Sequence, residues 1–341
     1  MSDRTDVEAL DALTSDAASV DLGPDQPMGH DLVVATGADR IRFLHGLVTG
    51  NVAGTPVGGG ARSVLLTTKG HVVGDLRIFV RPDDVWMVVP AGQGDSIAQA
   101  LSRYAIMDDF AAAPRADFRL LAVLGPGAAA RLAGVGVGVG ASDVLGDLGA
   151  RPLLSHASID AGNLWLVRVR ALGVEGFWIG GAPEVVAAVG ARLGQAGVAR
   201  LPAPLAEAAR IAAGEPRWGA EITPDYFPME VGLSSAIDYG KGCYLGQEPI
   251  VRIRDRGHIN WRLVGLDLDD AAGAGDEPAP GDALEADVKP RAGRVTSAAR
   301  LPDGRGVALA LLHVSVPAGT KIRIKHGDGL LAATVRGDAS P

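Results

Sequence analysis

The sequence predicts an α+β protein made of short strands and a few helices. Its 341 residues are 47% hydrophobic, which is enough to bury the cores of two or three domains. Its 47 glycines and 21 prolines interrupt apolar runs along the whole chain, as is typical of short strands joined by turns. Strand-like runs alternate with stretches at helical spacing up to residue 260, whereas residues 261–341 hold strand-like runs and turns.

The N-terminal residues 1–28 are predicted to form an acidic disordered tail. Eight acidic residues lie within residues 1–31, against Arg4. A segment of this kind, without aromatic residues, buries too little apolar surface to offset the entropy of ordering it. The rest of the chain is close to neutral, which argues against bulk attraction to nucleic acid or to acidic membranes. Direct binding of nucleic acid is therefore not expected.

The body of the protein begins with the pattern of a small α+β unit. Runs with strand propensity occupy residues 63–67, 76–80 and 85–89. The polar turn at residues 81–84 predicts that the last two runs form a hairpin. Ile97, Leu101 and Tyr104 then recur at helical spacing and predict a helix.

A second unit repeats this order. Its predicted strands lie at residues 120–124, 165–169 and 177–179, and its helix contains Val185, Val189 and Leu193. We therefore expect two similar α+β units side by side. Residues 205–213 have high helix propensity, and Gly214 and Pro216 predict the end of that helix.

The C-terminal part of the chain reads as a small β domain. Its predicted strands cover residues 263–268, 294–298, 307–312, 321–325 and 330–335, and residues 269–283 are expected to form a long loop. Five or six short strands at this spacing predict an antiparallel barrel or sandwich. The predicted division is a tail at residues 1–28, an α+β region at 29–260 and a β domain at 261–341.

Cysteine usage and hydropathy limit the class of protein. Cys243 is the single cysteine, so an intramolecular disulfide is excluded, and one thiolate cannot by itself supply a structural zinc or iron–sulfur site. No intrinsic metal site is predicted. The sequence has no run of about 18 apolar residues that could span a bilayer, and its first residues lack the basic features of targeting signals. These features predict a cytoplasmic protein without membrane contact.

The chemistry-bearing residues concentrate around Cys243. The segment 241–262 places Lys241 two residues before the cysteine and several arginines after it, which gives a basic patch in a neutral body. Nearby cations favour a thiolate over a thiol when the site stays partly exposed. The alternative is a small buried cysteine beside turn glycines, which is the commoner role of a free cysteine.

Three arginines follow in alternation with mostly apolar residues. Arg252, Arg254 and Arg256 alternate with Val251, Ile253 and Asp255, a spacing that on a strand would place the arginines on one face. Such a face is either a solvated strand surface or an anion site for carboxylates and phosphates. Both interpretations stay open from the residues alone.

The same segment resembles a known family. The run of eight residues that carries the resemblance is Lys241, Gly242, Cys243, Tyr244, Leu245, Gly246, Gln247 and Glu248. Followed by Arg252, the run Arg256–Gly257–His258 and Asn260, it resembles the signature of the YgfZ-type, folate-binding branch of the glycine-cleavage T-protein (GcvT) superfamily. Further similar stretches, at residues 210–221, 228–230, 293–297 and 307–310, extend the resemblance over most of the chain.

The resemblance implies a fold and a function. The implied fold is a GcvT-like ring of α+β domains around a channel that accepts tetrahydrofolate, with a C-terminal β-barrel. The implied function is support of iron–sulfur cluster assembly or repair, and through cluster enzymes support of tRNA modification. Folate and iron–sulfur client or assembly proteins are then the expected partners. The expected site residues are Cys243 and Lys241 as the reactive pair, Gly242, Tyr244, Gly246, Gln247 and Glu248 as the loop, and Asp75, Arg252, Arg254 and Arg256 for folate or another anion.

This chain departs from the T-protein pattern at three positions. Gly74 replaces the first aspartate of a pair whose second member is kept as Asp75. Trp178 falls where the T-protein has a pterin-binding glutamate, and Ala206 falls where it has an arginine. The resemblance therefore favours a non-enzymatic accessory protein. The alternatives are a tetrahydrofolate-dependent aminomethyltransferase or demethylase, and a module that docks RNA or protein on the arginine segment.

Overall fold

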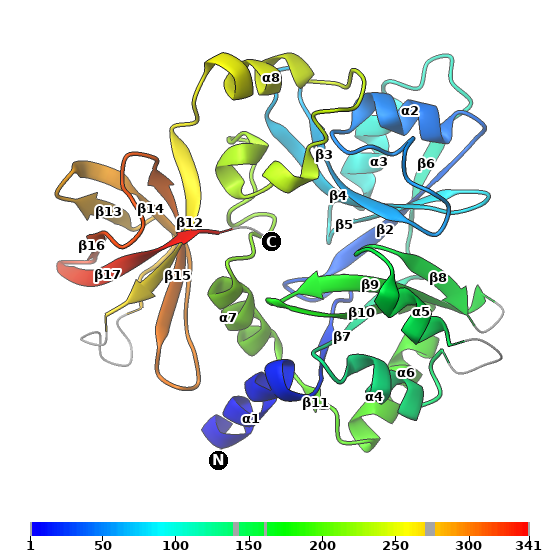
Figure 1. Ribbon diagram of the computed structural model, residues 1–341, viewed down its shortest axis with the longest axis horizontal. Coiled ribbons are helices and arrows are strands. Elements are labelled where there is room, and N and C mark those ends of the chain that lie inside the picture. The colour runs from blue at the N-terminus through cyan, green and yellow to red at the C-terminus, as the bar shows by residue number, and fades with distance from the viewer. Residues whose placement is uncertain (1, 139–142, 160–161, 270–276, 340–341) are drawn as a thin grey trace.

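The computed structural model describes residues 2–138, 143–159, 162–269 and 277–339, and its parts surround a central region (Figure 1). Two β-sheet units lie on one side, and a β-barrel lies on the other. Helix α7 (Ala203–Ala213) and helix α8 (Gln247–Arg256) lie between them. This arrangement confirms the predicted α+β fold with a C-terminal antiparallel barrel. Among the residues that the structure describes, no helix combines the length and the hydropathy of a membrane span.

The first unit is a five-stranded sheet in the order β3-β4-β5-β2-β6. Its elements are β2 (His30–Thr36), α2 (Arg40–Leu47), β3 (Gly60–Leu66), β4 (Val72–Val80), β5 (Val85–Pro90), α3 (Gly94–Ser102) and β6 (Ala111–Arg115). The predicted hairpin is confirmed, because β4 pairs antiparallel with β5 and the Arg81 N–H donates to Asp84 O across the turn. Helices α2 and α3 pack on one face of the sheet, where Phe43, Leu44 and Ile97 are buried.

The second unit is a six-stranded sheet in the order β11-β1-β7-β10-β9-β8. Its elements are β1 (Ala18–Asp21), β7 (Arg119–Leu124), α4 (Ala128–Gly134), α5 (Val144–Ala150), β8 (His156–Ile159), β9 (Leu164–Ala171), β10 (Val174–Gly181), α6 (Pro183–Gln195) and β11 (Ala199–Arg200). Helices α4, α5 and α6 cover its outer face (Figure 1). The inner face packs on the first sheet, with Phe79 and Trp86 of one unit against Trp165 of the other. The two sheet units therefore lie face to face.

The expected disordered tail at residues 1–28 is wrong. Residues Ser2–Ser15 form helix α1, and residues Ala18–Asp21 form β1 in the interior of the second sheet, between β7 and β11. Ala9 and Leu13 of α1 and Val20 of β1 are buried in the core shared by the two units. The few apolar residues of this acidic segment recur on one side of the helix. Their burial is enough to order the segment because β7 and β11 also pair with β1.

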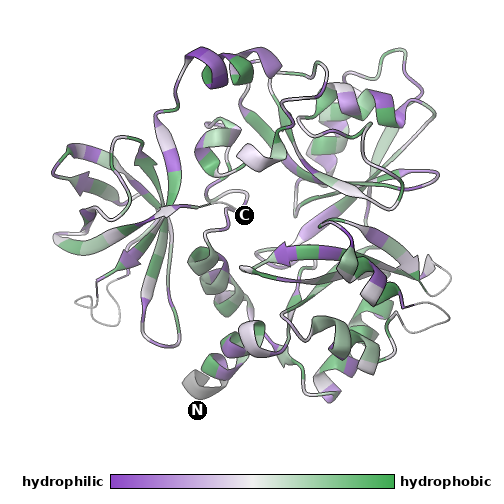
Figure 2. Cartoon of the chain, in the orientation of Figure 1, coloured by the Kyte–Doolittle hydropathy of each residue, from purple (hydrophilic) through white to green (hydrophobic). Residues whose placement is uncertain are grey.

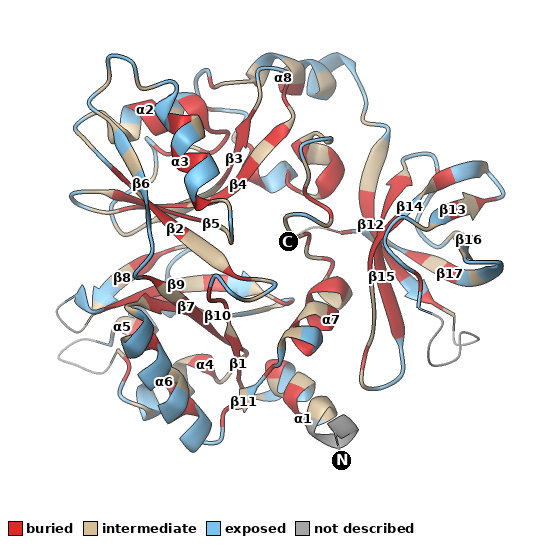
Figure 3. Ribbon diagram, turned by 180° about the vertical axis from the view of Figure 1, so that it is seen from behind, coloured by how far each residue is buried: buried red, intermediate tan, exposed pale blue. Residues whose placement is uncertain are grey.

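The C-terminal barrel is closed, with strand order β12-β15-β14-β13-β16-β17. Its strands are β12 (Trp261–Leu268), β13 (Ala283–Ala286), β14 (Lys289–Arg300), β15 (Gly306–His313), β16 (Lys321–His326) and β17 (Gly329–Asp338). Five of the six were predicted, and β13 was not. Figure 3 shows β12 and β15 buried over most of their length. Part of the predicted loop, residues 270–276, lies outside the described residues. The division at residue 261 into separate domains stays a prediction.

Helix α7 joins the sheet units to the barrel. It ends as predicted at Gly214, whose φ of +78° is the left-handed conformation that glycine adopts without strain. The Arg210 side chain, 2% exposed, donates to Glu221 on the following segment at 3.0 Å and to Ser297 of β14 at 2.7 Å. The Glu221 side chain is fully buried and also accepts from Ser297. This buried charge cluster fixes α7 against the barrel.

Candidate functional site

The signature segment lies at the outer edge of the first sheet unit, ahead of α8 (Figure 1). The Leu245 N–H donates to Gly46 O at the end of α2, and Pro249 lies against Gly70 in the β3–β4 turn. The predicted arginine strand is wrong, because residues Gln247–Arg256 form helix α8. Pro249 is compatible with a helix here because it sits in the first turn, where the backbone N–H has no helical acceptor.

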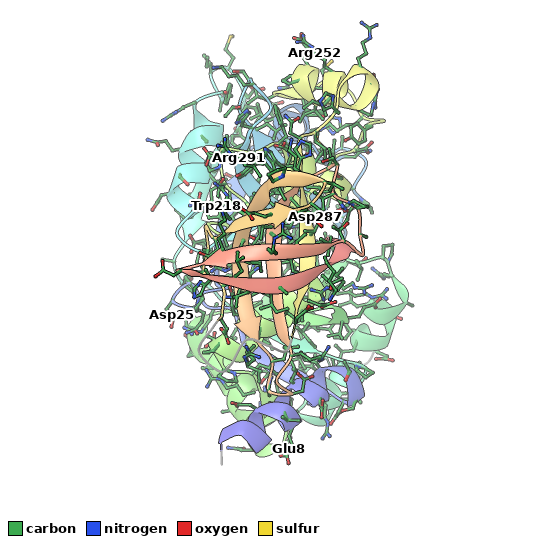
Figure 4. The ribbon with its side chains drawn as sticks, turned by 90° about the vertical axis from the view of Figure 1, so that its left-hand side faces the viewer. Glu8, Asp25, Trp218, Arg252, Asp287 and Arg291 are labelled. Atoms are coloured by element: carbon green, nitrogen blue, oxygen red, sulfur yellow. The ribbon has the colours of Figure 1, made fainter. Side chains whose placement is uncertain are left out.

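The helix spreads the three arginines instead of aligning them. Arg252 forms an exposed ion pair with Glu248 one turn earlier, at 2.9 Å. Arg254 pairs with the neighbouring Asp255 and stacks over the Tyr239 ring at 4.9 Å, and Arg256 is exposed. Figure 2 shows α8 as largely hydrophilic, and Figure 4 shows Arg252 on its outer side. The arginines form a solvated helix surface and do not converge on one anion site.

Cys243 and Lys241 have different environments. Cys243 is a free, exposed cysteine. Lys241 is buried, and its Nζ donates to the backbone oxygens of His45, Val48 and Gly50 at 2.5, 2.6 and 2.9 Å. Burial lowers the pKa of Lys241 to about 8, against a smaller opposing effect of Asp238. The ammonium thus binds the backbone oxygens at the end of α2, and its main role is to anchor the loop that carries the cysteine.

The two glycines of the loop are not equivalent. Gly246 has a φ of +77°, and a Cβ there would lie 2.3 Å from Thr67 O. Gly242 has open space around its Cβ position. The neighbouring Tyr244 ring is buried between the first unit and the 3-10 helices η2 (Pro228–Val231) and η3 (Ser234–Ala236). Gly246 therefore sets the approach of α8 to the β3–β4 turn, and Gly242 does not.

We expect Gly246→Ala to destabilise the protein and Gly242→Ala to leave it unchanged. The left-handed backbone alone costs alanine about 1–2 kcal/mol, and the collision with Thr67 O adds to it. At Gly242 the change should stay within about 0.5 kcal/mol. Urea unfolding followed by tryptophan fluorescence measures both free energies. Equal values for the two variants would contradict the assigned geometry.

A second group of predicted residues surrounds a central cavity of about 140 Å³. It lies where the two sheets meet the end of α7, and its lining includes Asp75, Arg77, Trp178 and Arg210. Asp75 and Arg77 alternate on β4 and so lie on the same face of the sheet. Gly74 faces the opposite way, where a Cβ would lie 2.3 Å from Ile97 Cδ1 in the core below α3. An aspartate at position 74 would not fit without moving Ile97.

Asp75 is held by a partner of its own. Its carboxylate accepts two hydrogen bonds from Arg62 of β3, at 3.1 and 2.8 Å, and is 4% exposed. Burial alone would raise the pKa of Asp75, but the charge and hydrogen bonds of Arg62 hold it below its usual value. The carboxylate is therefore ionised and paired with Arg62, so it stands in the cavity wall as half of an ion pair.

Sequence reasoning missed His30 and Arg77, which meet Trp178 at the cavity. The Arg77 guanidinium lies over the Trp178 ring at 5.0 Å, and the His30 and Trp178 ring centroids are 5.1 Å apart. Burial, followed by the charge of Arg77, lowers the pKa of His30 to about 3, so its imidazole is neutral. The two-residue spacing of Asp75 and Arg77 could have indicated that the two side chains share one face of a strand. Nothing in the sequence linked His30, which lies 45 residues before Asp75, to the same cavity.

The structure divides the predicted residues between two places. Asp75 and Trp178 line the central cavity, whereas Ala206 is buried in the shared core and is not part of that lining. Cys243 and the α8 arginines are also outside the lining. No group of three or more His, Cys, Asp or Glu in the described ranges could hold a metal ion. The molecule therefore has a surface thiol and, apart from it, a cavity whose wall combines apolar side chains with a few buried polar ones.

Comparison with known proteins identifies the family. The profile of the GCVT N-terminal domain matches residues 28–241. The chain belongs to that family. Relatives named "tRNA-modifying protein YgfZ" place it in the YgfZ-type branch of the superfamily, as the signature had indicated. The protein of that name from Yersinia pseudotuberculosis is 28% identical over 300 residues, covering 86% of this chain and 85% of the relative.

Two other proteins are similar to this GcvT-family chain over most of its length. A protein of Arabidopsis thaliana named "Putative transferase At1g60990, chloroplastic" is 26% identical over 303 residues, and the match spans 88% of this chain but 66% of the plant protein. The crystal structure of glycine cleavage system aminomethyltransferase T from Bartonella henselae superposes with a TM-score of 0.83 at 21% identity, covering 97% of this chain and 88% of that one. The latter match establishes the GcvT-like fold.

Proposed function

We propose that this chain is a folate-binding accessory protein that supports tRNA modification by assisting the assembly or repair of iron–sulfur clusters in partner enzymes. The observation that carries the proposal is the match of YgfZ-named, tRNA-modifying relatives across 86% of the chain. Tetrahydrofolate, a carrier of one-carbon units, is the proposed ligand of the central cavity. The cytoplasmic location expected from the sequence is part of the same proposal.

The cavity residues fit an oxygen-rich ligand such as folate. Trp178 Nε1 and His30 Nδ1 are buried without a hydrogen-bond partner, and Arg77 lies beside them. Buried polar groups without partners cost stability, so a cavity lined by them favours a ligand that satisfies them. His30, Arg77 and Trp178 would hold the polar edge of the ligand, and the apolar side chains of Leu22 and Leu124 would cover its ring.

Cys243 is the proposed contact with the iron–sulfur partner. It is exposed on the outer loop, where another protein reaches it without entering the cavity. In this proposal the thiolate is a transient ligand or nucleophile toward a partner's cluster, and the chain holds no cluster of its own. The anchoring of Lys241 to α2 supports the proposal by keeping the loop in one position.

A transferase would need the charge of Asp75 for its substrate. Positioning and stabilising a reacting amine calls for a carboxylate whose charge is available to that amine, and losing such a group costs orders of magnitude in rate. Here the charge of Asp75 is already balanced by the guanidinium of Arg62, which donates one hydrogen bond to each carboxylate oxygen. This favours the accessory protein over the aminomethyltransferase or demethylase. The exposed arginines of α8 are the feature that a docking module for RNA or protein would use.

Two substitutions, tested in cells that lack the native gene, distinguish the accessory protein from the transferase. We expect Cys243→Ser to abolish support of an iron–sulfur tRNA-thiolating enzyme, and Asp75→Asn to leave that support within a few-fold of wild type, with soluble levels matched. The thiolated nucleoside content of tRNA is the measurement. Equal loss of thiolated nucleosides in both variants would favour the transferase over the accessory protein. If neither variant loses them, the α8 arginines become the candidate functional surface, and the double variant Arg252→Glu with Arg254→Glu tests them.

A further inference from the structure

The outer face of the C-terminal barrel carries a hollow of about 470 Å³, here called the first hollow. The strand register places several of its residues in one row across β16, β13, β14 and β15, namely Lys325, Ala283, Arg294 and Leu311. Residues paired in this way share one face of a sheet. The small side chain of Ala283 lies between the two cations, so the hollow stays open between them.

Two aromatic rings border the first hollow. Trp261 of β12 and Tyr226, from the segment ahead of η2, pack against the apolar cluster that contains Leu311 and remain partly exposed. The rings of Trp261 and His313 meet edge to face, with centroids 5.7 Å apart. The Arg294 guanidinium lies over the Tyr226 ring at 5.5 Å. A flat ligand that stacks in this hollow would remove the exposed ring surface from water.

The positive charge of the first hollow is only partly balanced by the protein. Arg291, which Figure 4 shows on the barrel side of the molecule, is exposed and has no hydrogen bond or ion pair with any residue that the structure describes. Arg294 donates to the neutral hydroxyl group of Tyr226. Lys325 pairs with Glu285 at 2.6 Å, and Glu285 is the carboxylate of this lining. Two guanidinium groups are thus left for an anionic ligand.

A second hollow, of about 350 Å³, adjoins the first at Arg294, which lines both. Its wall includes Thr296, which is 6% exposed and whose Oγ1 is buried without a hydrogen-bond partner. Thr296 is the extra residue of a β-bulge, because the register with β15 skips it between Val295 and Ser297. A buried hydroxyl without a partner costs stability, so this wall favours a ligand that supplies a polar oxygen.

We propose that the two adjoining hollows bind an unpaired nucleotide, as found in a single-stranded nucleic acid. Its base lies against Trp261 and Tyr226, and its phosphate lies on Arg291 and Arg294. The Thr296 hydroxyl group bonds an oxygen of the adjoining sugar and phosphate. Aromatic rings interleaved with cations are the usual means of binding single strands. The site is local, so it does not require the bulk positive charge that this acidic chain lacks, and it is separate from the proposed folate cavity.

Other ligand classes fit the two hollows less well. A flexible chain of carboxylates would use the guanidinium groups and leave the rings of Trp261 and Tyr226 unused. An apolar peptide would cover the rings and take the arginines out of water without a partner. A base within a duplex is stacked on both faces, so only an unpaired base is free to enter a hollow of this kind. The volume of the first hollow lies within the roughly 300–1,000 Å³ of small-molecule pockets.

Fluorescence anisotropy of the full chain with a labelled oligoadenylate of about ten nucleotides tests the site. We expect binding at about 50 mM salt that weakens steeply by about 200 mM, because phosphate contacts release counterions. Unlabelled AMP, the unlabelled oligoadenylate and a duplex of the same length then serve as competitors. The comparison of AMP with the oligoadenylate distinguishes a free mononucleotide from a single strand as the ligand.

Three variants assign the binding to the hollows. Trp261→Leu removes the stacking surface and should weaken binding about 5- to 100-fold. Arg291→Glu should weaken it at least about fivefold and reduce its salt dependence. Arg305→Glu makes the same change of charge at the β14–β15 turn, where Arg305 is 70% exposed and outside both hollows. This matched control should stay within about twofold of the unaltered chain, because salt screens an exposed charge outside the site.

Weaker binding in Trp261→Leu and Arg291→Glu, with binding kept in Arg305→Glu, supports the site. Stronger competition by the oligoadenylate identifies a single strand as the ligand, equal competition by AMP identifies a free mononucleotide, and either result supports the nucleotide site. Equal loss in Arg291→Glu and Arg305→Glu overturns it, because binding would then follow bulk charge. A duplex that competes as well as the single strand also overturns it, as does binding of neither AMP nor the oligoadenylate.

Circular dichroism shows whether each variant is folded before titration. Arg291 is exposed and unpaired among the described residues, so Arg291→Glu tests the site even where Trp261→Leu does not fold. The proposed folate function does not depend on any of these outcomes, because the two hollows and the central cavity have different linings.

Discussion

Deletion of residues 1–28 is expected to leave little or no folded protein. This segment contributes Leu13, Val20 and Leu22 to the core between the two sheet units, and burial of each side chain of this size is worth about 1.5–3 kcal/mol. The deletion also removes β1 from between β7 and β11, which exposes the β7 edge. These losses approach the whole stability of a typical domain, about 5–15 kcal/mol. Soluble yield and circular dichroism measure the result.

Point substitutions test whether the segment stabilises the protein through its buried side chains and not merely through its length. Leu13→Ala should cost about 2–5 kcal/mol, because Leu13 is 3% exposed, whereas Asp11→Ala on the exposed side of α1 should be close to neutral. Thermal unfolding compares the two. A truncated chain that melts at the wild-type temperature would show that α1 and β1 contribute nothing to the core, and would restore the prediction of a dispensable tail.

Arg210→Met is expected to cost about 3–5 kcal/mol of folding free energy, the usual result of removing one partner from a buried ion pair. Glu221 would remain fully buried without its cation, and Ser297 of β14 would lose a partner. Methionine fills much of the space of the arginine stem, so lost charge rather than a cavity accounts for the effect. Urea unfolding of the full chain gives the free energy.

A rim arginine serves as the control for this cluster. Arg217 pairs with Glu207 at 3.2 Å but is 37% exposed, so Arg217→Met should cost well under about 1 kcal/mol. The double variant Arg210→Met with Glu221→Gln should recover part of the loss, because the buried charge is removed. If the single and double variants unfold alike, the buried charge is not the cause.

The same cluster predicts a direction for the pH dependence of stability. Burial would raise the pKa of Glu207, but the hydrogen bonds and charge of Arg210, with those of Arg217, lower it below its usual value. A lowered carboxyl pKa stabilises the fold at neutral pH, and that stabilisation is lost as the pH falls through the lowered pKa. Arg210→Met should therefore flatten the fall in stability between neutral and acidic pH.

Local sequence patterns predicted the elements that local interactions define. The β4–β5 hairpin has its turn residues between two apolar runs, and α7 has a helix-forming composition that ends at Gly214, so both were visible without knowledge of their partners. Strand β13 was missed because its four residues, Ala283–Ala286, are short and follow a stretch rich in glycine, alanine and proline. Its pairing with β14 and β16 supplies the order that its own sequence lacks.

Elements that depend on distant partners were predicted wrongly. The acidic composition of residues 1–28 indicated disorder, but β7 and β11 complete a sheet around β1. The alternation of Arg252, Arg254 and Arg256 fits a strand by period, but the left-handed Gly246 and the early Pro249 start a helix against the β3–β4 turn. A two-residue alternation over so short a stretch does not by itself distinguish the two structures.

The candidate site was located by sequence in part. The eight-residue similarity identified the Cys243 loop, and Asp75 and Trp178 were named at positions that do share one cavity. The direction of the Lys241 side chain was not predictable, because its three acceptors belong to residues 45–50 and only folding brings them together. The contact of His30 with Trp178 was missed for the same reason, since the two residues come from different sheet units.

The pairing of β1 with β11 has a consequence for the order of folding during synthesis. Ser19 donates to Ala199, 180 residues further along the chain, whereas the five strands of the first sheet unit all come from residues 30–115. The first unit is complete soon after it leaves the ribosome, while α1 and β1 wait for β7 and then β11 to emerge. Through that interval their apolar residues stay exposed. The acidic residues around them keep this waiting segment hydrated, which gives the N-terminal charge a role before the native state exists.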